Sequence, residues 1–593
     1  MKTDEKICEL RKMMDRYGLD AYIVPSSDPH LSEYLSEDWK ERAWISGFTG
    51  SAGTFAATKY HSGLWADGRY FIQAEKQLEG SEIKLFKIGN PGVPTCEQWL
   101  ADSLKQGETV GFSGNLISVS AFKQMEKKFR EKGILINSRH DLVAEIWRER
   151  PAPSSAGIFI HPLRFTGLAA REKIATVREE MKKASVDQYL ISSLDDIAWL
   201  FNIRGGDIPF VPVAAAYALV SMDEAILFID PAKVDGDTAE FLRENGIELA
   251  EYHRVEGRLS ALEDGQSVGF DPVRTSYRLY DAINPECGRK RLNEITAGLK
   301  AVKNERELEN FKECQVNDGI AMVRFLMWLE KHLGEREISE YSAAEAVDRF
   351  RSLQENNIGP GFATIAGFKD HGAMMHYLPE KEGSYLLEGG GMLVLDSGGQ
   401  YLNGTTDITR TIVINELSGE EMHDFTMALK SHIALATAKF LYGATGSNLD
   451  ILARKPLWDI GLDYKCGTGH GVGYCLSVHE GPQRFHQIVN NVRLEKGMIL
   501  TIEPGIYREG KHGVRTENMY RVVEDERTEF GQFMRFETMT YCPIDKGGID
   551  NGLLSRDEKY WLNDYHSLVY RELSPHLQEE ERQWLAGATE PVL

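Results

Sequence analysis

The sequence predicts an α/β protein in which two similar α/β domains precede a larger domain of mixed helices and strands. Three observations predict this class: a helix-then-strand repeat near the start, a Pro- and Ser-rich segment between its two copies, and a change of pattern after residue 300. A chain of 593 residues is also too long for one domain, because domains usually hold about 100–200 residues.

The repeat relates residues 10–28 to residues 177–195, with six identical positions. Each copy begins as a polar amphipathic helix and continues into a short apolar strand, AYIV in the first copy and QYLI in the second. Both strands stop at a Ser/Asp turn. Chance similarity is the alternative, since helix followed by strand is a common unit, but we favour two similar α/β domains.

Two boundaries separate the predicted domains. Residues 150–157 read RPAPSSAG, a composition typical of a linker. A long helical pattern begins near residues 299–306. The predicted domains are therefore residues 1–155, 156–302 and 303–593.

The third domain alternates amphipathic helices with strands punctuated by glycine. One helix is predicted from the pattern of residues 307–333, and another over residues 418–441, which opens with a capping box at Ser418 and Glu421. The predicted strands are residues 362–368, 391–398, 408–414 and 497–507.

Composition excludes several classes of function. The formal net charge is −22, whereas a protein that coats nucleic acid or docks on an anionic membrane needs an excess of Lys and Arg. The longest apolar run, residues 209–220, is too short to span a bilayer, and the first residues lack an apolar signal-peptide core. The seven cysteines form no CxxC pair, which suits a reducing compartment. We expect a cytoplasmic protein with no nucleic-acid and no membrane partner.

Acidic residues occupy strand positions in the third domain. Asp396 ends an apolar run, Asp407 precedes another, and the residues between them read as a hairpin turn that would bring both onto neighbouring strands. Glu503 interrupts a third apolar run, Glu517 lies in a further strand-like piece, and His470 stands between two glycines. Taken singly, each carboxylate is best explained as a strand end that faces water. Together they favour a metal site, because buried carboxylates are costly unless paired or metal-bound.

The chemistry of this set indicates the class of metal. Four carboxylates carry a charge of −4, which two divalent cations would neutralise. Oxygen-rich ligands with one imidazole favour Mn²⁺ or a similar ion over a thiolate zinc site.

Several segments carry a resemblance to a known family. They are LDSGGQYLNGTTDITRT, GTGHGVG, VHEGP, TIEPGIY and GVRTEN in the third domain, ISGFTGSAGT and LWADGRYFIQAEKQL in the first, and YWLNDYH near the end. They resemble the pita-bread metallopeptidases, and specifically the long, three-domain Xaa-Pro aminopeptidases (aminopeptidase P). The resemblance implies two creatinase-type N-terminal α/β domains followed by a pita-bread catalytic domain.

The resemblance implies a ligand set for two divalent metal ions, most commonly Mn²⁺, with Zn²⁺ or Co²⁺ as alternatives. Asp407 and Glu517 would bridge the two ions. A water held between the metals would lose a proton to Glu503, the implied general base, and attack the scissile carbonyl. The complete implied set is Asp396, Asp407, His470, Glu503 and Glu517.

Three further residues match family positions. His376 and His479 match the histidines that contact the substrate and stabilise the tetrahedral intermediate. Without the resemblance, we would interpret both as ordinary, partly buried histidines. Arg515 stands two residues before Glu517, so on one strand both would share a face. It matches an arginine that orients a ligand carboxylate, and a surface salt bridge is the alternative. Cys466 stands where many relatives carry histidine, which puts the selectivity of the site in doubt; a soft metal ligand is a further interpretation.

The implied function is hydrolysis of the bond between the N-terminal residue and a proline in second position. The expected partners are such peptides and a second copy of the chain, as a homodimer. Prolidase, which cuts only dipeptides, is the nearest alternative. A non-catalytic pita-bread scaffold and a metal-free creatinase-like hydrolase are disfavoured because all five ligands are present.

Overall fold

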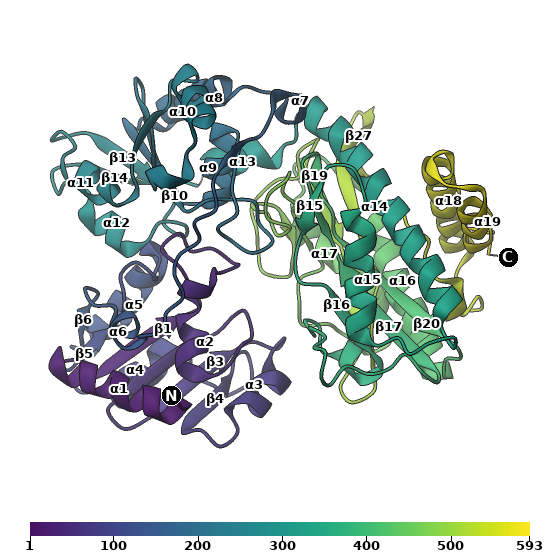
Figure 1. The fold of residues 1–593 in the computed structure, drawn as a ribbon, viewed down its shortest axis with the longest axis horizontal. Coiled ribbons are helices and arrows are strands. Elements are labelled where there is room, and N and C mark those ends of the chain that lie inside the picture. The colour runs from purple at the N-terminus through teal and green to yellow at the C-terminus, as the bar shows by residue number, and fades with distance from the viewer. Residues whose placement is uncertain (294, 593) are drawn as a thin grey trace. The chain divides into compact units, whose positions relative to one another are not determined.

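The computed structural model describes residues 1–293 and 295–592, and the chain divides into two compact units (Figure 1). Unit 1 comprises Met1–Pro162 and Leu168–Thr296, and unit 2 comprises Leu163–Gly167 and Ala297–Leu593. Within the described residues, no helix has the length and apolar character needed to cross a membrane.

Unit 1 contains two α/β domains with one sheet each. The first has helices α1 (Thr3–Arg16), α2 (Glu41–Ser46), α3 (Phe71–Leu78), α4 (Cys96–Ser103), α5 (Val119–Glu131) and α6 (Leu142–Ile146), and strands β1 (Ala21–Pro25), β2 (Thr54–Thr58), β3 (Ser62–Ala66), β4 (Ile83–Lys87), β5 (Thr109–Gly111) and β6 (Leu135–Asn137). The second has helices α8 (Ala170–Ala184), α9 (Leu194–Phe201), α10 (Gly236–Glu244), α11 (Val255–Ser260) and α12 (Tyr277–Ala282), and strands β8 (Gln188–Ile191), β10 (Ala216–Ser221), β11 (Ala225–Ile229), β12 (Glu248–Glu251), β13 (Ser267–Phe270) and β14 (Gly288–Arg291). The short strands β7 (Phe159–Ile160) and β9 (Ile203–Arg204) pair with each other.

The two sheets have the same topology. Their orders are β4-β3-β2-β1-β5-β6 and β12-β11-β10-β8-β13-β14, and the corresponding pairs have the same direction. The first three strands of each domain pair antiparallel, and the outer strands are parallel to their neighbours. The repeat predicted from the sequence is confirmed, since its two copies form α1–β1 and α8–β8.

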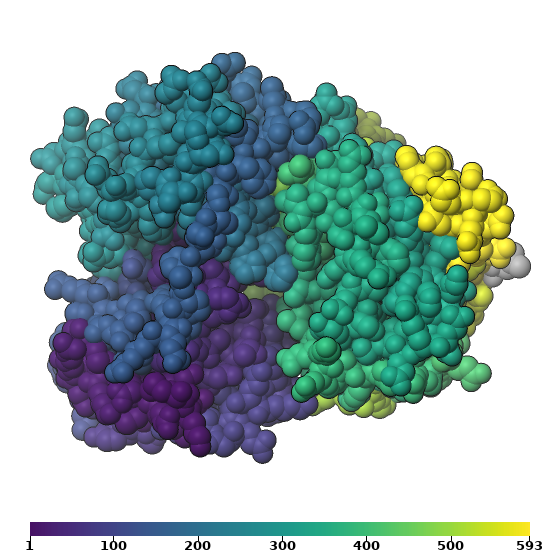
Figure 2. Space-filling model, in the orientation of Figure 1, coloured from purple at the N-terminus to yellow at the C-terminus, as the bar shows by residue number. Residues whose placement is uncertain are grey.

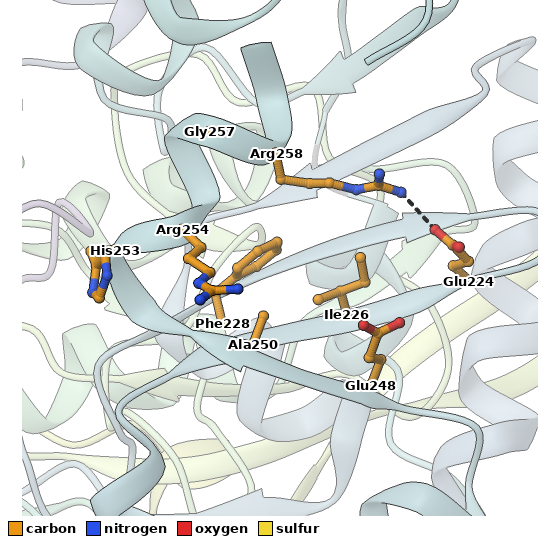
Figure 3. Close-up of a pocket in the computed structure, with 9 residues that line it drawn as sticks. All are labelled: Glu224, Ile226, Phe228, Glu248, Ala250, His253, Arg254, Gly257 and Arg258. Carbon is orange, nitrogen blue, oxygen red and sulfur yellow. Dashed lines mark hydrogen bonds and ion pairs between the residues drawn. The ribbon is translucent and has the colours of Figure 1, made fainter. Parts of the chain in front are cut away.

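A pocket of about 570 Å³ lies on the second sheet, against β11, β12 and α11 (Figure 3). Arg258 extends across it to Glu224, with which it forms an ion pair of 2.7 Å. The group of side chains that could hold a metal ion, as found among the described residues, lies in unit 2 and not in this pocket.

Unit 2 is the mixed domain. Its helices are α7 (Leu163–Thr166), α14 (Glu305–His332), α15 (Glu340–Ser352), α16 (Gly419–Ala436), α17 (Gly446–Trp458), α18 (Arg556–Leu573) and α19 (Glu579–Ala588), with α13 (Ile295–Ala301) at the boundary to unit 1. Its strands are β15 (Asn357–Pro360), β16 (Ile365–Phe368), β17 (Gly391–Ser397), β18 (Gly399–Tyr401), β19 (Gly404–Thr405), β20 (Ile408–Ile414), β21 (Lys439–Leu441), β22 (Gly469–His470), β23 (Arg484–Phe485), β24 (Ile499–Ile502), β25 (Gly505–Arg508), β26 (His512–Arg515), β27 (Asn518–Thr528) and β28 (Gly531–Thr538). In the space-filling view α18 and α19 (yellow) lie on the outside of this unit (Figure 2).

Two sheets form the centre of unit 2, with strand orders β16-β17-β20 and β21-β28-β27-β24. Strand β17 is fully buried, which explains its continuous apolar sequence. Helix α16 begins at the predicted capping box but ends at Ala436 rather than Leu441. The backbone of Lys439–Leu441 instead pairs with β28, so sheet pairing overrides the helical pattern there.

A segment from early in the chain completes unit 2. The backbone carbonyls of Thr166, Phe165 and Arg164 in α7 accept hydrogen bonds from the side chains of Asn304, Tyr474 and Asn310. Phe165 also packs in an apolar cluster of this unit. Unit 2 is therefore not continuous in sequence.

Candidate metal centre

The two predicted aspartates lie on neighbouring antiparallel strands. Asp396 is the penultimate residue of β17, where it lies opposite Thr409 of β20, and Asp407 directly precedes β20. The predicted hairpin between them is confirmed, because β18 and β19 continue the antiparallel register of β17 and β20 up to a turn at Leu402 and Asn403. Strand β18 also pairs with β15, so the end of the hairpin belongs to a separate three-stranded sheet.

The two glutamates lie just beyond strand ends. Glu503 follows β24, and Pro504, which cannot donate a backbone hydrogen bond, separates β24 from β25. Glu517 falls between β26 and β27 rather than inside one strand, and its backbone N–H donates to the Thr409 carbonyl at 3.2 Å. Each of the two predicted strands is therefore divided into two strands at its glutamate.

Three ligand atoms converge. Single atoms of Asp407, His470 and Glu517 all lie within 4.8 Å of one another. His470 Nε2 is 3.3 Å from Asp407 Oδ2 and 3.6 Å from Glu503 Oε1. Its Nδ1 is 3.0 Å from the Gly471 carbonyl, which accepts an Nδ1–H bond and thereby leaves Nε2 available to a metal.

The carboxylates are buried in a way that fits a cation. The exposed fractions are 8% for Asp396, 4% for Asp407 and 1% for Glu517. Burial, with like charge from Asp407, raises the pKa values of Asp396 and Glu503, and raises that of Glu517 further. Asp396 Oδ1 and Glu517 Oε1 are buried without a hydrogen-bond partner. An oxygen-rich donor set with unsatisfied atoms fits divalent metal ions.

Arg515 connects the two sides of the site. Its guanidinium donates to Asp396 Oδ2 at 2.7 Å, to the Tyr507 hydroxyl at 2.7 Å and to Thr409 Oγ1 at 3.1 Å. The Thr409 hydroxyl in turn donates to Glu517 Oε2 at 2.7 Å. Arg515 is only 3% exposed, so it is not part of a surface salt bridge.

Thr409 and Tyr507 were missed by the sequence analysis. Thr409 would have emerged from aligning the two aspartate strands, because it lies opposite Asp396. Tyr507 would have emerged from a hairpin over residues 505–515, in which it is the diagonal neighbour of Arg515.

Both predicted substrate histidines belong to loops beside this site. The ring of His479 meets that of His470 edge to face, with centroids 4.3 Å apart. His376 follows Met375, whose carbonyl accepts a hydrogen bond of 3.5 Å from Arg515.

A buried carboxylate on α15 anchors the loop that contains His376. Glu340 is fully buried and accepts hydrogen bonds from Phe368 N at 2.6 Å, His371 Nδ1 at 3.0 Å, the Tyr377 hydroxyl at 3.1 Å and Tyr385 N at 2.7 Å. The His371 ring stacks on the rings of Tyr377 and Tyr385, with centroids 4.3 and 3.8 Å away. These contacts hold the loop on both sides of His376.

Replacing Glu340 with Gln is expected to loosen this loop, because an amide accepts at one atom only. We expect faster amide hydrogen exchange over residues 369–388 and a fall in kcat of about tenfold, the effect of losing hydrogen bonds to a charged acceptor. The matched control is Glu345→Gln on the exposed face of the same helix. Unchanged exchange in Glu340→Gln would show that the loop does not depend on this carboxylate.

Cys466 lies near the site, but it does not belong to the group of converging ligand atoms among the described residues. In the metal-free site, burial, and then the charge of Glu503, raise the pKa of its thiol to about 12. Its carbonyl accepts a hydrogen bond of 2.8 Å from Arg454.

Comparisons with known proteins agree along the whole chain. Residues 6–145 and 149–307 each match the creatinase/prolidase N-terminal domain. Residues 309–524 match metallopeptidase family M24, and residues 532–592 match the C-terminal region of that peptidase. Aminopeptidase P2 of Arabidopsis thaliana is 40% identical over 632 aligned residues, which cover 100% of this chain and 89% of the plant protein. The chain belongs to the aminopeptidase P family.

Other relatives support this membership. A probable Xaa-Pro aminopeptidase P of Laccaria bicolor is 39% identical over 100% of this chain and 94% of the fungal protein. The crystal structure of an X-prolyl aminopeptidase of Caenorhabditis elegans, described as a cytosolic enzyme with a di-nuclear active site, superimposes with a TM-score of 0.95 at 35% identity, covering 100% of both chains. The aminopeptidase P fold expected from the sequence, two creatinase-type domains and a pita-bread domain, is confirmed.

Proposed function

We infer that this chain is an Xaa-Pro aminopeptidase with a dinuclear metal active site in unit 2. The observation that carries this inference is the convergence of buried Asp407, His470 and Glu517 in a chain that matches aminopeptidase P over its whole length. When bound, two divalent ions lower the pKa of water and polarise a carbonyl.

We propose that five residues would hold the two ions. Mn²⁺ is the proposed metal, and the same oxygen and imidazole donors also accept Zn²⁺ and Co²⁺. The unsatisfied oxygens of Asp396 and Glu517 support this assignment. The proposed ligands are Asp396, Asp407, His470, Glu503 and Glu517.

Other side chains would accept a proton, bind the substrate or orient a ligand carboxylate. Glu503 is the proposed general base, because its side chain is 23% exposed and can therefore reach a water at the site. His376 and His479 would hydrogen-bond the substrate and the tetrahedral intermediate, and Arg515 would orient Asp396 through their 2.7 Å contact.

The purified, Mn²⁺-loaded protein is expected to release arginine from Arg-Pro-Pro and to leave Arg-Ala-Ala intact, since proline's fixed φ and missing N–H give its bond a distinct shape. Mass spectrometry of the products measures the cleavage of both tripeptides. An Arg-Pro dipeptide tests the prolidase alternative. Cleavage of the dipeptide alone would favour prolidase. A protein that binds no divalent ion after reconstitution would favour the non-catalytic scaffold.

We further propose that the enzyme is a cytoplasmic homodimer. Four apolar side chains on and just after α17 support the dimer: Ile451, Leu452, Trp458 and Ile460 are each exposed by 36–45%, which is typical of an interface. The cytosolic relative from Caenorhabditis elegans supports the compartment.

Placing a charge in this apolar group is expected to weaken dimerisation. Trp458→Asp should sediment as a monomer at concentrations where the unmodified protein is twice the chain mass, because the charge would be buried unpaired. Tyr560→Asp, at an exposed site on α18, is the control. A monomeric unmodified protein, or a dimeric Trp458→Asp, would contradict this surface as the interface.

A further inference from the structure

One buried histidine lies behind the two glutamates and is not explained by the reaction. His432 on α16 is 0% exposed. Its Nδ1 is 3.0 Å from the Ile502 carbonyl and 3.2 Å from the Thr516 carbonyl. These two residues immediately precede Glu503 and Glu517.

The contacts define the proton position on the ring. Two carbonyl oxygens at Nδ1 require an N–H there, since a bare nitrogen would meet two acceptors. Nε2 is 2.7 Å from the Tyr520 hydroxyl and accepts its hydrogen. Burial, and then the charge of Arg410, lower the pKa of His432 to about 3, which agrees with a neutral ring.

His432 contacts the backbone at the point where the pairing of strands β24 and β27 ends. The pairing of β24 with β27 ends at Ile502 opposite Asn518, so Glu503 and Glu517 lie one residue beyond the last pair. The shared Nδ1–H joins the two backbone segments at this point. Helix α16 is capped and packed in the core of unit 2. It therefore holds the ring of His432, and with it the backbone before both glutamates, in a fixed position.

We propose that His432 is a positioning residue whose Nδ1–H sets the spacing between Glu503 and Glu517 and thereby the affinity for the metal ions. This inference rests on the proposed function, because it assumes that both glutamates are metal ligands. His432 touches neither substrate nor metal and acts only through the two backbone carbonyls.

Two near-isosteric substitutions distinguish the contribution of Nδ1 from that of Nε2. The amide nitrogen of Asn in His432→Asn reaches the place of Nδ1 and can still donate to both carbonyls, whereas the amide of Gln in His432→Gln reaches only the place of Nε2. We expect His432→Gln to weaken Mn²⁺ binding by about tenfold or more, as loss of a group that orients ligands does. We expect His432→Asn to retain affinity within about threefold of the unmodified protein.

Binding is measured by competition with a chelator, and Xaa-Pro cleavage is followed on the same samples. His566→Gln is the control for replacing a fully buried histidine, because His566 lies on α18 and accepts from the backbone N–H of Ile544, away from the two glutamates. Equal affinities in His432→Asn and His432→Gln, whether both weak or both intact, would overturn the proposal. An unmodified protein that bound no Mn²⁺ would instead remove the proposed function, and this inference with it.

A second measurement leaves His432 itself unchanged. In the unmodified protein labelled with ¹⁵N-histidine, His432 should show the neutral tautomer protonated at Nδ1, assigned by its shift change in Tyr520→Phe. A signal protonated at Nε2 would overturn the proposal, since the carbonyls of Ile502 and Thr516 would then lack their donor.

Discussion

Replacing Glu517 with Gln is expected to lower kcat/KM for an Xaa-Pro peptide by about 10³-fold, because a metal centre supplies several kcal/mol of transition-state stabilisation and each 1.36 kcal/mol is tenfold in rate. Glu517 is 1% exposed and contributes one of the three converging ligand atoms. Steady-state kinetics with metal content determined on the same sample measures the effect. The control is Glu524→Gln, at an exposed position of β27.

The same substitution should lower activity but raise the stability of the metal-free protein. Burial, and then the like charges of the neighbouring carboxylates, raise the pKa of Glu517 well above the ordinary value, so an uncharged amide relieves both costs in the metal-free fold. Metal-free Glu517→Gln should therefore unfold at a higher temperature than the metal-free unmodified protein, and metal should stabilise it less. Full activity, or a less stable metal-free variant, would contradict the assignment of Glu517 as a ligand.

Replacing Asp318 with Asn is expected to destabilise unit 2 by about 3 kcal/mol or more, the cost of breaking a buried ion pair by removing one partner. Asp318 on α14 accepts from Arg351 at 2.8 and 3.1 Å, from the Tyr401 hydroxyl at 2.9 Å and from the Thr406 hydroxyl at 2.8 Å. Since Thr406 directly precedes Asp407, weaker metal binding should accompany the loss of stability. Urea-induced unfolding and Mn²⁺ binding measure the two effects.

Two comparisons test the cause. Asp459→Asn removes an exposed pair with Lys455 and should cost less than about 1 kcal/mol. Asp318→Asn combined with Arg351→Met should recover part of the loss, because no unpaired charge then remains buried. Equal costs for the Asp318 and Asp459 variants would show that the buried pair contributes no more than a surface pair.

The sequence was sufficient to predict the domain pattern because hydrophobic periodicity reports local structure. The repeat could be identified because α1–β1 and α8–β8 occupy the same place in matching sheets. The strand 408–414 was predicted with its true limits, since both of its ends carry strong local signals. Helix 418–441 was predicted too long, because the competing partner for Lys439–Leu441 lies about 90 residues later in β28.

The candidate ligands were recognisable from the sequence, but the residues that hold them were not. Asp396 and Glu503 stand out as acidic residues in apolar runs. His432 and Glu340, by contrast, lie on helices, and what distinguishes them is which backbone groups they contact across the fold. Such contacts depend on the packing of elements distant in sequence, which no local pattern encodes.

The early segment that completes unit 2 has a consequence for biosynthesis. About 130 residues separate Gly167 from Ala297, and at 5–20 residues per second the ribosome needs roughly 10 s to make them. During that time Asn304, Asn310 and Tyr474, whose side chains donate hydrogen bonds to α7, are not yet translated. A recombinant fragment that starts at Ala297 would lack Phe165 and would expose the apolar surface that it covers.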